Sequence, residues 1–166
     1  MSIRKAKALN IESCNIRETS VKDLEIITQF TLKLHQHEDD GEIPPHQNFS
    51  VNLRAWLSSG LKDSNALFLV AEKNQCPIGF ISAVCVINDN GFSSSPIKGL
   101  IQLLWVEPEH RKNLTAEMLV KKVEACFKEM AIGVVECNYT SSNQLAESFW
   151  KKQGYKKSSM TARKIF

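Results

Sequence analysis

The segment Leu100–Val120 holds the residues of this sequence that are best suited to chemistry. It reads as an apolar strand that ends at Pro108, followed by a short polar turn and the start of a helix. A helix start exposes unpaired backbone N–H groups and the positive end of the peptide dipoles, and this arrangement binds phosphate. Arg111 and Lys112 add positive charge at the turn. A plain packing unit with a basic turn has the same pattern, so both interpretations stay open.

A second region with chemical potential is the polar, proline-containing segment His35–Gln47. Its acids would attract a cationic amine, although a solvated acidic loop is the simpler interpretation. These acids are Glu38, Asp39, Asp40 and Glu42. His37 could act as a general base, because imidazole titrates near neutrality. The spacing of His35, His37 and the acids matches no specific metal motif, so we predict no metal site.

The elements that must position these residues alternate between strand and helix. Ser20 and Asp23 are typical of a helix start, and apolar residues follow at helical spacing. Two apolar runs around Asn74-Gln75 predict a hairpin. The expected order is strand Cys14–Arg17, helices from Ser20 and from Ser50, strands Ala66–Glu72, Ile78–Ile87 and Leu100–Val106, helix Thr115–Met130, strand Val134–Asn138, helix Asn143–Gln153 and a last extended segment Tyr155–Phe166.

Composition supports one mixed α/β domain over residues 1–166. Hydrophobic residues make up 43% and charged residues 23%, which is typical of a soluble globular protein. The net charge of +3 is too small to indicate nucleic-acid binding. No apolar run is long enough for a membrane span, and Met1–Asn10 lacks the apolar core of a secretory signal.

The five cysteines are odd in number and show no C-x-x-C spacing, so a reducing, cytoplasmic location is expected. We interpret Cys137 as a buried strand residue rather than a nucleophile.

Two motifs resemble the signatures of a known family. The first begins at Val106 and reads Val-x-Pro-x-x-Arg-x-x-Leu-x-Ala-x-x-Leu, and the second begins at Asn143 and reads Asn-x-x-Ala-x-x-Phe-Trp-x-x-x-Gly-Tyr. Both are similar to motifs of the GNAT superfamily of acetyl-CoA-dependent N-acetyltransferases. Ile16-Arg17 with Asp23-x-x-x-Ile27, and Pro77-Ile78-Gly79-Phe80, resemble the family's first strand and helix and its third strand. The resemblance spans residues 14 to about 157, nearly the whole chain.

The resemblance implies a fold, two substrates and a set of site residues. The fold is an α/β (α+β) domain with a mixed, mostly antiparallel sheet, flanking helices and splayed central strands. Acetyl-CoA would be the acyl donor, a primary amine of a small cationic molecule or protein would be the acceptor, and a homodimer is possible. The Val106 amide would polarise the thioester. The remaining cofactor contacts implied are Leu104, Trp105, Arg111, Lys112, Asn113, Leu114, Thr115, Ala116, Asn143 and Trp150.

Three positions depart from the family pattern. Leu114 replaces a loop glycine and would add ~1 kcal/mol of strain if the backbone there stays left-handed. Trp150 replaces a tyrosine proposed to protonate the leaving thiolate, so an acid would have to come from Tyr155, Tyr139 or water. Gln102 replaces a glutamate that helps to deprotonate the amine. Glu107 is the nearest carboxylate, although strand alternation could turn it away from the face of Gln102.

These departures keep two other interpretations open. One is a degenerate GNAT-like domain that binds acyl-CoA or a partner without catalysis, which Leu114, Trp150 and Gln102 favour modestly. The other is an α/β domain unrelated to CoA. Turnover of acetyl-CoA with an amine separates the enzyme from the binding module, and a failure to bind CoA would favour the unrelated domain.

Overall fold

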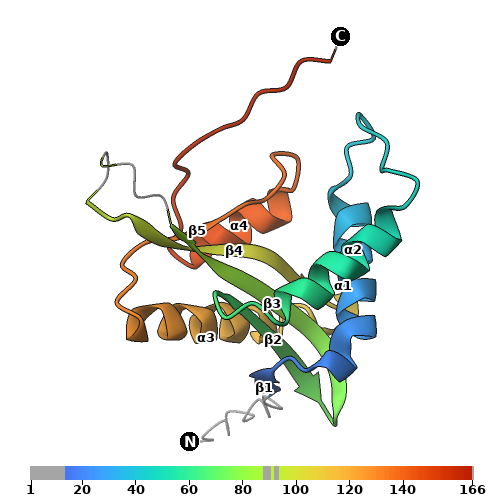
Figure 1. Cartoon of the computed structure of the whole chain (residues 1–166), viewed down its shortest axis with the longest axis horizontal. Coiled ribbons are helices and arrows are strands. Elements are labelled where there is room, and N and C mark those ends of the chain that lie inside the picture. Colours follow the sequence, from blue (N-terminus) through green and yellow to red (C-terminus); the bar gives the residue numbers. More distant parts are fainter. Residues whose placement is uncertain (1–13, 88–90, 92–93, 166) are drawn as a thin grey trace, which may run out of the picture.

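The computed structural model describes residues 14–87, 91 and 94–165, which form a five-stranded sheet with helices on both faces (Figure 1). The strands lie in the order β1-β2-β3-β4-β5. Neighbouring strands from β1 to β4 are antiparallel, and β5 is parallel to β4. The expected mixed, mostly antiparallel sheet with flanking helices is confirmed. The segment Met1–Asn10 and part of the expected loop Asn88–Ser95 lie outside the described residues.

The element bounds follow the sequence expectations closely. The strands are β1 Asn15–Glu18, β2 Ala66–Lys73, β3 Cys76–Ile87, β4 Ile97–Val106 and β5 Val135–Cys137. The helices are α1 Leu24–Glu38, α2 Phe49–Gly60, α3 Thr115–Glu129 and α4 Gln144–Lys152, with short 3-10 helices at Val21–Asp23 and Pro108–His110.

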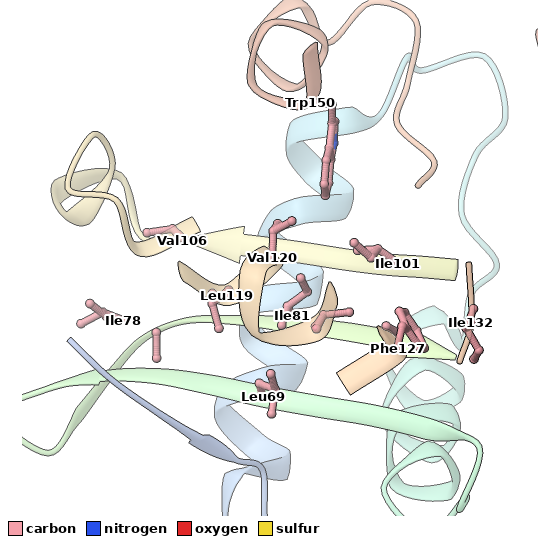
Figure 2. Close-up of a cluster of buried hydrophobic side chains, with 13 residues drawn as sticks. Leu69, Ile78, Ile81, Ile101, Val106, Leu119, Val120, Phe127, Ile132 and Trp150 are labelled. Atoms are coloured by element: carbon pink, nitrogen blue, oxygen red, sulfur yellow. The ribbon is translucent and has the colours of Figure 1, made fainter. Parts of the chain in front are cut away.

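Two apolar clusters cover opposite faces of the sheet. Adjacent strand residues such as Leu69 and Val70 belong to different clusters, as the alternation of side chains in a strand requires. The first cluster joins α3 and α4 to the sheet, and Figure 2 shows Leu119 and Phe127 among its members. The second cluster joins α1 and α2 to the other face through residues such as Phe30. The apolar core therefore has two layers, with the sheet between them.

Local sequence signals account for the tight turns. Asn74 and Gln75 both have positive φ, at 51° and 64°, which fits the two-residue hairpin turn between β2 and β3. Before α1, the Asp23 carboxylate accepts hydrogen bonds from the Ser20 N–H and hydroxyl at 2.7 and 2.9 Å. The Arg17 guanidinium also binds this carboxylate and holds its pKa well below the usual range. This ion pair fixes β1 to the start of α1.

The expected last strand is wrong. Residues 155–165 form no strand, and we call them the C-terminal tail. Its apolar residues Met160 and Ile165 are exposed, at 88% and 59%. A strand is stabilised by packing one face against neighbours, and this polar, lysine-rich stretch offers no such face.

Candidate active site

A β-bulge in β4 decides which side chains share a face of the sheet. Ser82 of β3 pairs with Leu103, but the next residue, Ala83, pairs with Ile101, so Gln102 is an extra residue in β4. A bulge shifts the two-residue alternation of side chains by one position. As a result, Gln102 and Leu103 both line a cavity against α1 and α2.

Glu107, which sequence reasoning predicted as a catalytic carboxylate, lies on this same face. Its Oε1 is paired with the Lys33 ammonium of α1, and its Oε2 accepts a hydrogen bond from the Trp105 indole N–H at 3.3 Å. The expectation that alternation could turn Glu107 away from the face of Gln102 is wrong. The extra residue at the bulge shifts by one position which β4 side chains point to that face. Lys33 and Trp105 therefore engage both oxygens of this carboxylate.

The edge of β4 on the β5 side has no strand partner over the last described residues of β4. β5 pairs with β4 only over Gly99–Ile101, so the two central strands separate beyond that point. The Glu107 N–H donates to the Ile78 carbonyl of β3 at 2.9 Å. Consecutive N–H groups in a strand point to alternate sides. The N–H groups of Leu104 and Val106 therefore point to the open edge, which we call the open β4 edge.

The turn between β4 and α3 keeps a left-handed backbone without glycine. Leu114 has φ 61° and Lys112 has φ 66°. The first hydrogen bond of α3 is donated by Met118 to the Leu114 carbonyl at 2.8 Å. Within the described residues, the backbone amides of 112–117 donate to no acceptor, as expected for the first turn of a helix. This turn presents free donors at the positive end of the α3 dipole.

Arg111 joins the turn to the open β4 edge. Its Nε donates to the Val106 carbonyl at 2.9 Å, and its guanidinium lies 4.6 Å from the centre of the Trp105 ring. The side chain therefore lies against the last residues of β4, where the turn to α3 begins. The predicted cofactor residues from Leu104 to Ala116 thus meet at one corner, where β4 ends and α3 begins.

The α4 residues of the predicted site have structural partners. Asn143 accepts a hydrogen bond from the Ala146 N–H at 3.0 Å and donates to the Glu38 carboxylate at 2.9 Å. It therefore starts α4 and ties it to α1. Trp150 is 5% exposed and packs in the cluster below α4 (Figure 2). Its ring centre lies 4.9 Å from that of Tyr155.

Tyr155 is held by α3. Its hydroxyl donates to Glu124 at 3.0 Å. Burial, together with this hydrogen bond, raises the pKa of the Tyr155 phenol above its usual range. Proton transfer from such a phenol to a thiolate is unfavourable, since thiols are much stronger acids. Burial also raises the pKa of the Cys137 thiol to about 12, which agrees with a structural role in β5.

A cavity of about 550 Å³ opens between α1, α2 and β4, and we call it the α1–α2 cavity. Leu53, Trp56 and Leu103 supply apolar walls. Its polar lining includes His35, Glu38, Asp39, Asp40 and Gln102. The segment His35–Gln47, expected as a loop, instead begins inside α1, and its acids line the cavity or stand beside it. A cavity of this size fits a small molecule.

The C-terminal tail reaches the rim of this cavity, which sequence reasoning did not foresee. Arg163 lies 3.0 Å from Asp40 and 2.9 Å from Glu42, so it bridges two acids of the α1–α2 loop. The basic residues of the tail and the acids of the loop were visible in the sequence, but their contact joins positions 121 and 123 residues apart.

The sequence profile of the Acetyltransferase (GNAT) family matches residues 28–155. The chain belongs to this family. Solved structures share the fold of this GNAT chain. A predicted acetyltransferase from Clostridium acetobutylicum with acetyl-CoA has a TM-score of 0.77 at 18% identity, over 92% of this chain and 96% of that one. An aminoglycoside 6'-N-acetyltransferase from Acinetobacter baumannii has a TM-score of 0.72 at 21% identity, over 93% and 98%. No curated protein sequence matches the chain significantly.

Among the described residues, no group of three or more His, Cys, Asp or Glu side chains could hold a metal ion. None of the helices in that part of the chain is long and apolar enough to cross a bilayer.

Proposed function

We propose that this GNAT protein is an N-acetyltransferase that moves an acetyl group from acetyl-CoA to a primary amine of a small cationic molecule or protein. The observation that carries the proposal is the corner where the open β4 edge meets the free amides of 112–117. Solved structures that share this fold contain acetyl-CoA or CoA, which supports acetyl-CoA as the donor here.

The cofactor half of the reaction would use mainly backbone groups. The amides of 112–117 and the Arg111 guanidinium would bind the diphosphate of CoA. The open β4 edge at Leu104 and Trp105 would lie along the pantetheine arm. The Val106 N–H would then donate to the thioester carbonyl oxygen, where negative charge develops as the amine attacks. Holding both reactants in this orientation lowers the entropic part of the barrier.

The acceptor half would use the α1–α2 cavity. Its acids attract a cation, and its apolar walls would pack against the carbon frame of the molecule. Relatives in fold include an aminoglycoside N-acetyltransferase in complex with a bisubstrate analogue, CoA-S-monomethyl-acetylneamine. This supports cationic amines as the first acceptors to try. All five cysteines are free, which supports a reducing, cytoplasmic location.

One set of contacts favours the alternative, a domain that binds acyl-CoA without catalysis. Glu107 is paired with Lys33, and the Tyr155 hydroxyl is bonded to Glu124. Both predicted proton-transfer groups are thus occupied, and Gln102 cannot accept a proton.

One experiment separates the two functions. Release of free CoA from acetyl-CoA is measured with kanamycin, spermidine and a lysine-containing peptide as acceptors, and CoA binding is measured by calorimetry. We expect CoA release that depends on at least one amine. Binding of CoA without amine-dependent release would favour the binding module, and the absence of CoA binding would remove both.

A further inference from the structure

The α1–α2 cavity has an aromatic wall that the rest of the protein leaves partly uncovered. Trp56 of α2 lines the cavity and is 45% exposed. Among the described residues, it is the only Trp, Phe or Tyr that is exposed rather than buried or half-buried. Tryptophan buries most of its surface on average in soluble proteins. A tryptophan left open inside a cavity therefore indicates a ligand that would cover it.

The spacing of apolar residues along α2 explains why Trp56 faces the cavity. Phe49, Leu53 and Trp56 stand at positions i, i+4 and i+7, so they share one side of the helix, and all three line the cavity. Leu57, the next residue, is fully buried in the cluster that joins α2 to the sheet. The core thus takes Leu57 and leaves Trp56 at the cavity.

The apolar wall continues beyond α2. The ring of His35, on α1, stacks on Phe49, with the ring centres 4.4 Å apart and the planes inclined by 31°. The Nε2 atom of His35 is buried and has no hydrogen-bond partner within the described residues, so it offers the cavity no polar contact. In the loop that joins α1 to α2 (Figure 1), Ile43 also lines the cavity and is 58% exposed. Two large side chains from different elements, Trp56 and Ile43, are thus open to the same space.

The charge of the cavity favours a cation. Glu38, Asp39 and Asp40 belong to its lining. Of the described residues in that lining, Arg163 alone is a lysine or arginine, and it is already paired with Asp40 and with Glu42 at the rim. The acids outnumber the fixed cations, so a positively charged ligand is favoured over an anion. The ligand that fits best therefore joins a positive charge to an apolar surface.

We propose that the α1–α2 cavity selects amines that carry an aromatic ring, and that Trp56 is the specificity-determining residue that stacks on this ring. This inference rests on the proposed function and deepens it, because it names the kind of amine that the cavity accepts. Aromatic rings pack on one another in offset or edge-on geometry. A cavity of about 550 Å³ has room for a ring with a short aminoalkyl chain.

The cavity also reaches the strand that would hold the thioester. Leu103 of β4 belongs to its lining, and the next residue, Leu104, has its N–H on the open β4 edge. The aminoalkyl chain of a molecule whose ring lies on Trp56 would extend toward this part of β4.

Amines without a ring fit this lining less well. The hydroxyl groups of a sugar-based amine would lose water when they are pressed against Trp56, Ile43 and Leu53, and these side chains return no hydrogen bond to the hydroxyls in exchange. A linear polyamine has no flat face for stacking, and its ammonium groups would bind over the indole by a cation–π contact instead. The two modes differ in what they predict, because a cation–π site would favour a polyamine over an amine with one charge.

The test measures the release of CoA from acetyl-CoA by the full-length protein with 2-phenylethylamine, n-butylamine and spermidine. All three carry a primary amine, and only the first has a ring. We expect kcat/KM for 2-phenylethylamine to exceed the values for both other amines by at least tenfold. Equal values for the three amines, or a preference for spermidine, would overturn the inference and leave the proposed function in place.

Variants of α2 assign the preference to one side chain. Trp56→Ala should raise KM for 2-phenylethylamine about tenfold, with KM for n-butylamine, kcat and Tm close to wild type. Trp56→Phe keeps an aromatic face and should recover most of the preference. Val51→Ala, at an exposed residue of α2 outside the cavity lining, should behave as wild type. An unchanged ratio between the two amines in Trp56→Ala would contradict the role of Trp56.

Calorimetry separates a failure of the inference from a failure of the proposed function. Here 2-phenylethylamine is titrated into the CoA complexes of the wild type and of Trp56→Ala. Binding that is about tenfold weaker in the variant supports the ring site, whereas equal binding to both proteins, or binding to neither, overturns it. The absence of CoA release with every amine would overturn the proposed function, whichever result calorimetry gives.

Discussion

The two halves of the candidate site are built from different material. At the corner of the open β4 edge and the start of α3, the binding groups are mostly backbone amides, and the left-handed turn survives with leucine in place of glycine. In the α1–α2 cavity, the groups are side chains from α1, the following loop, β4 and the C-terminal tail. A backbone site tolerates changes of side chain, whereas a side-chain site changes its chemistry with each substitution. The first half therefore depends on the path of the backbone, and the second half depends on which side chains line the cavity.

The largest expected effect tests whether a backbone N–H of the open β4 edge contributes to catalysis. Val106→Pro removes the N–H that points to the open β4 edge and keeps the pairing with β3, because that pairing uses the neighbouring residues. We expect kcat to fall about 10²–10³-fold with a modest change in Tm. Leu104→Pro, on the same edge, should raise KM for acetyl-CoA more than it lowers kcat. An unchanged kcat in Val106→Pro would remove the Val106 amide from the mechanism.

Arg111 is the side chain on which the first half depends most. Arg111→Ala removes the bond to the Val106 carbonyl and one positive charge at the end of β4, so CoA should bind about 10–100-fold more weakly. Calorimetry with CoA measures this effect, and thermal unfolding should show little loss of fold. Arg111→Lys keeps the charge but loses the Nε contact, and it should show an intermediate affinity. If Arg111→Ala binds CoA as wild type does, the phosphate assignment of this turn fails.

Leu114 tests how well the turn accepts a side chain. Leu114→Gly relieves about 1 kcal/mol of left-handed strain, so CoA affinity should stay equal or rise by up to about fivefold. Leu114→Val should weaken binding, since a β-branched residue is least tolerated at positive φ. The side chain of Leu114 is 49% exposed, so neither change disturbs the core. A large loss of affinity in Leu114→Gly would mean that the leucine side chain itself contacts the cofactor.

The smallest expected effect concerns the ion pairs at the rim of the α1–α2 cavity. Arg163→Ala leaves Asp40 and Glu42 free to attract a cationic acceptor, and KM for that amine should fall about twofold at low salt. The difference should vanish as salt screens the exposed charges. Lys156→Ala, at another exposed basic residue of the C-terminal tail, should leave KM unchanged. A rise in KM in Arg163→Ala would instead assign the tail a role in holding the acceptor.

The sequence anticipated the strand, turn and helix at the end of β4 because their signals are local. Pro108 ends the strand, the spacing from Arg111 to Ala116 sets the turn, and the apolar stripe that begins at Leu119 requires a helix. Each feature depends on residues within one or two turns of chain. The same local logic failed for the C-terminal tail, where a strand needed a packed face that residues 155–165 do not supply.

The sequence by itself therefore determined the helices, most of the strands and the turn between β4 and α3. Only the tertiary structure decided the contents of the α1–α2 cavity. The bulge at Gln102 is a property of the register between β3 and β4, the Lys33–Glu107 pair joins residues 74 positions apart, and the unused nitrogen of His35 depends on what packs around it. Such long-range contacts are fixed when the layers pack, because no local stretch of chain contains both partners.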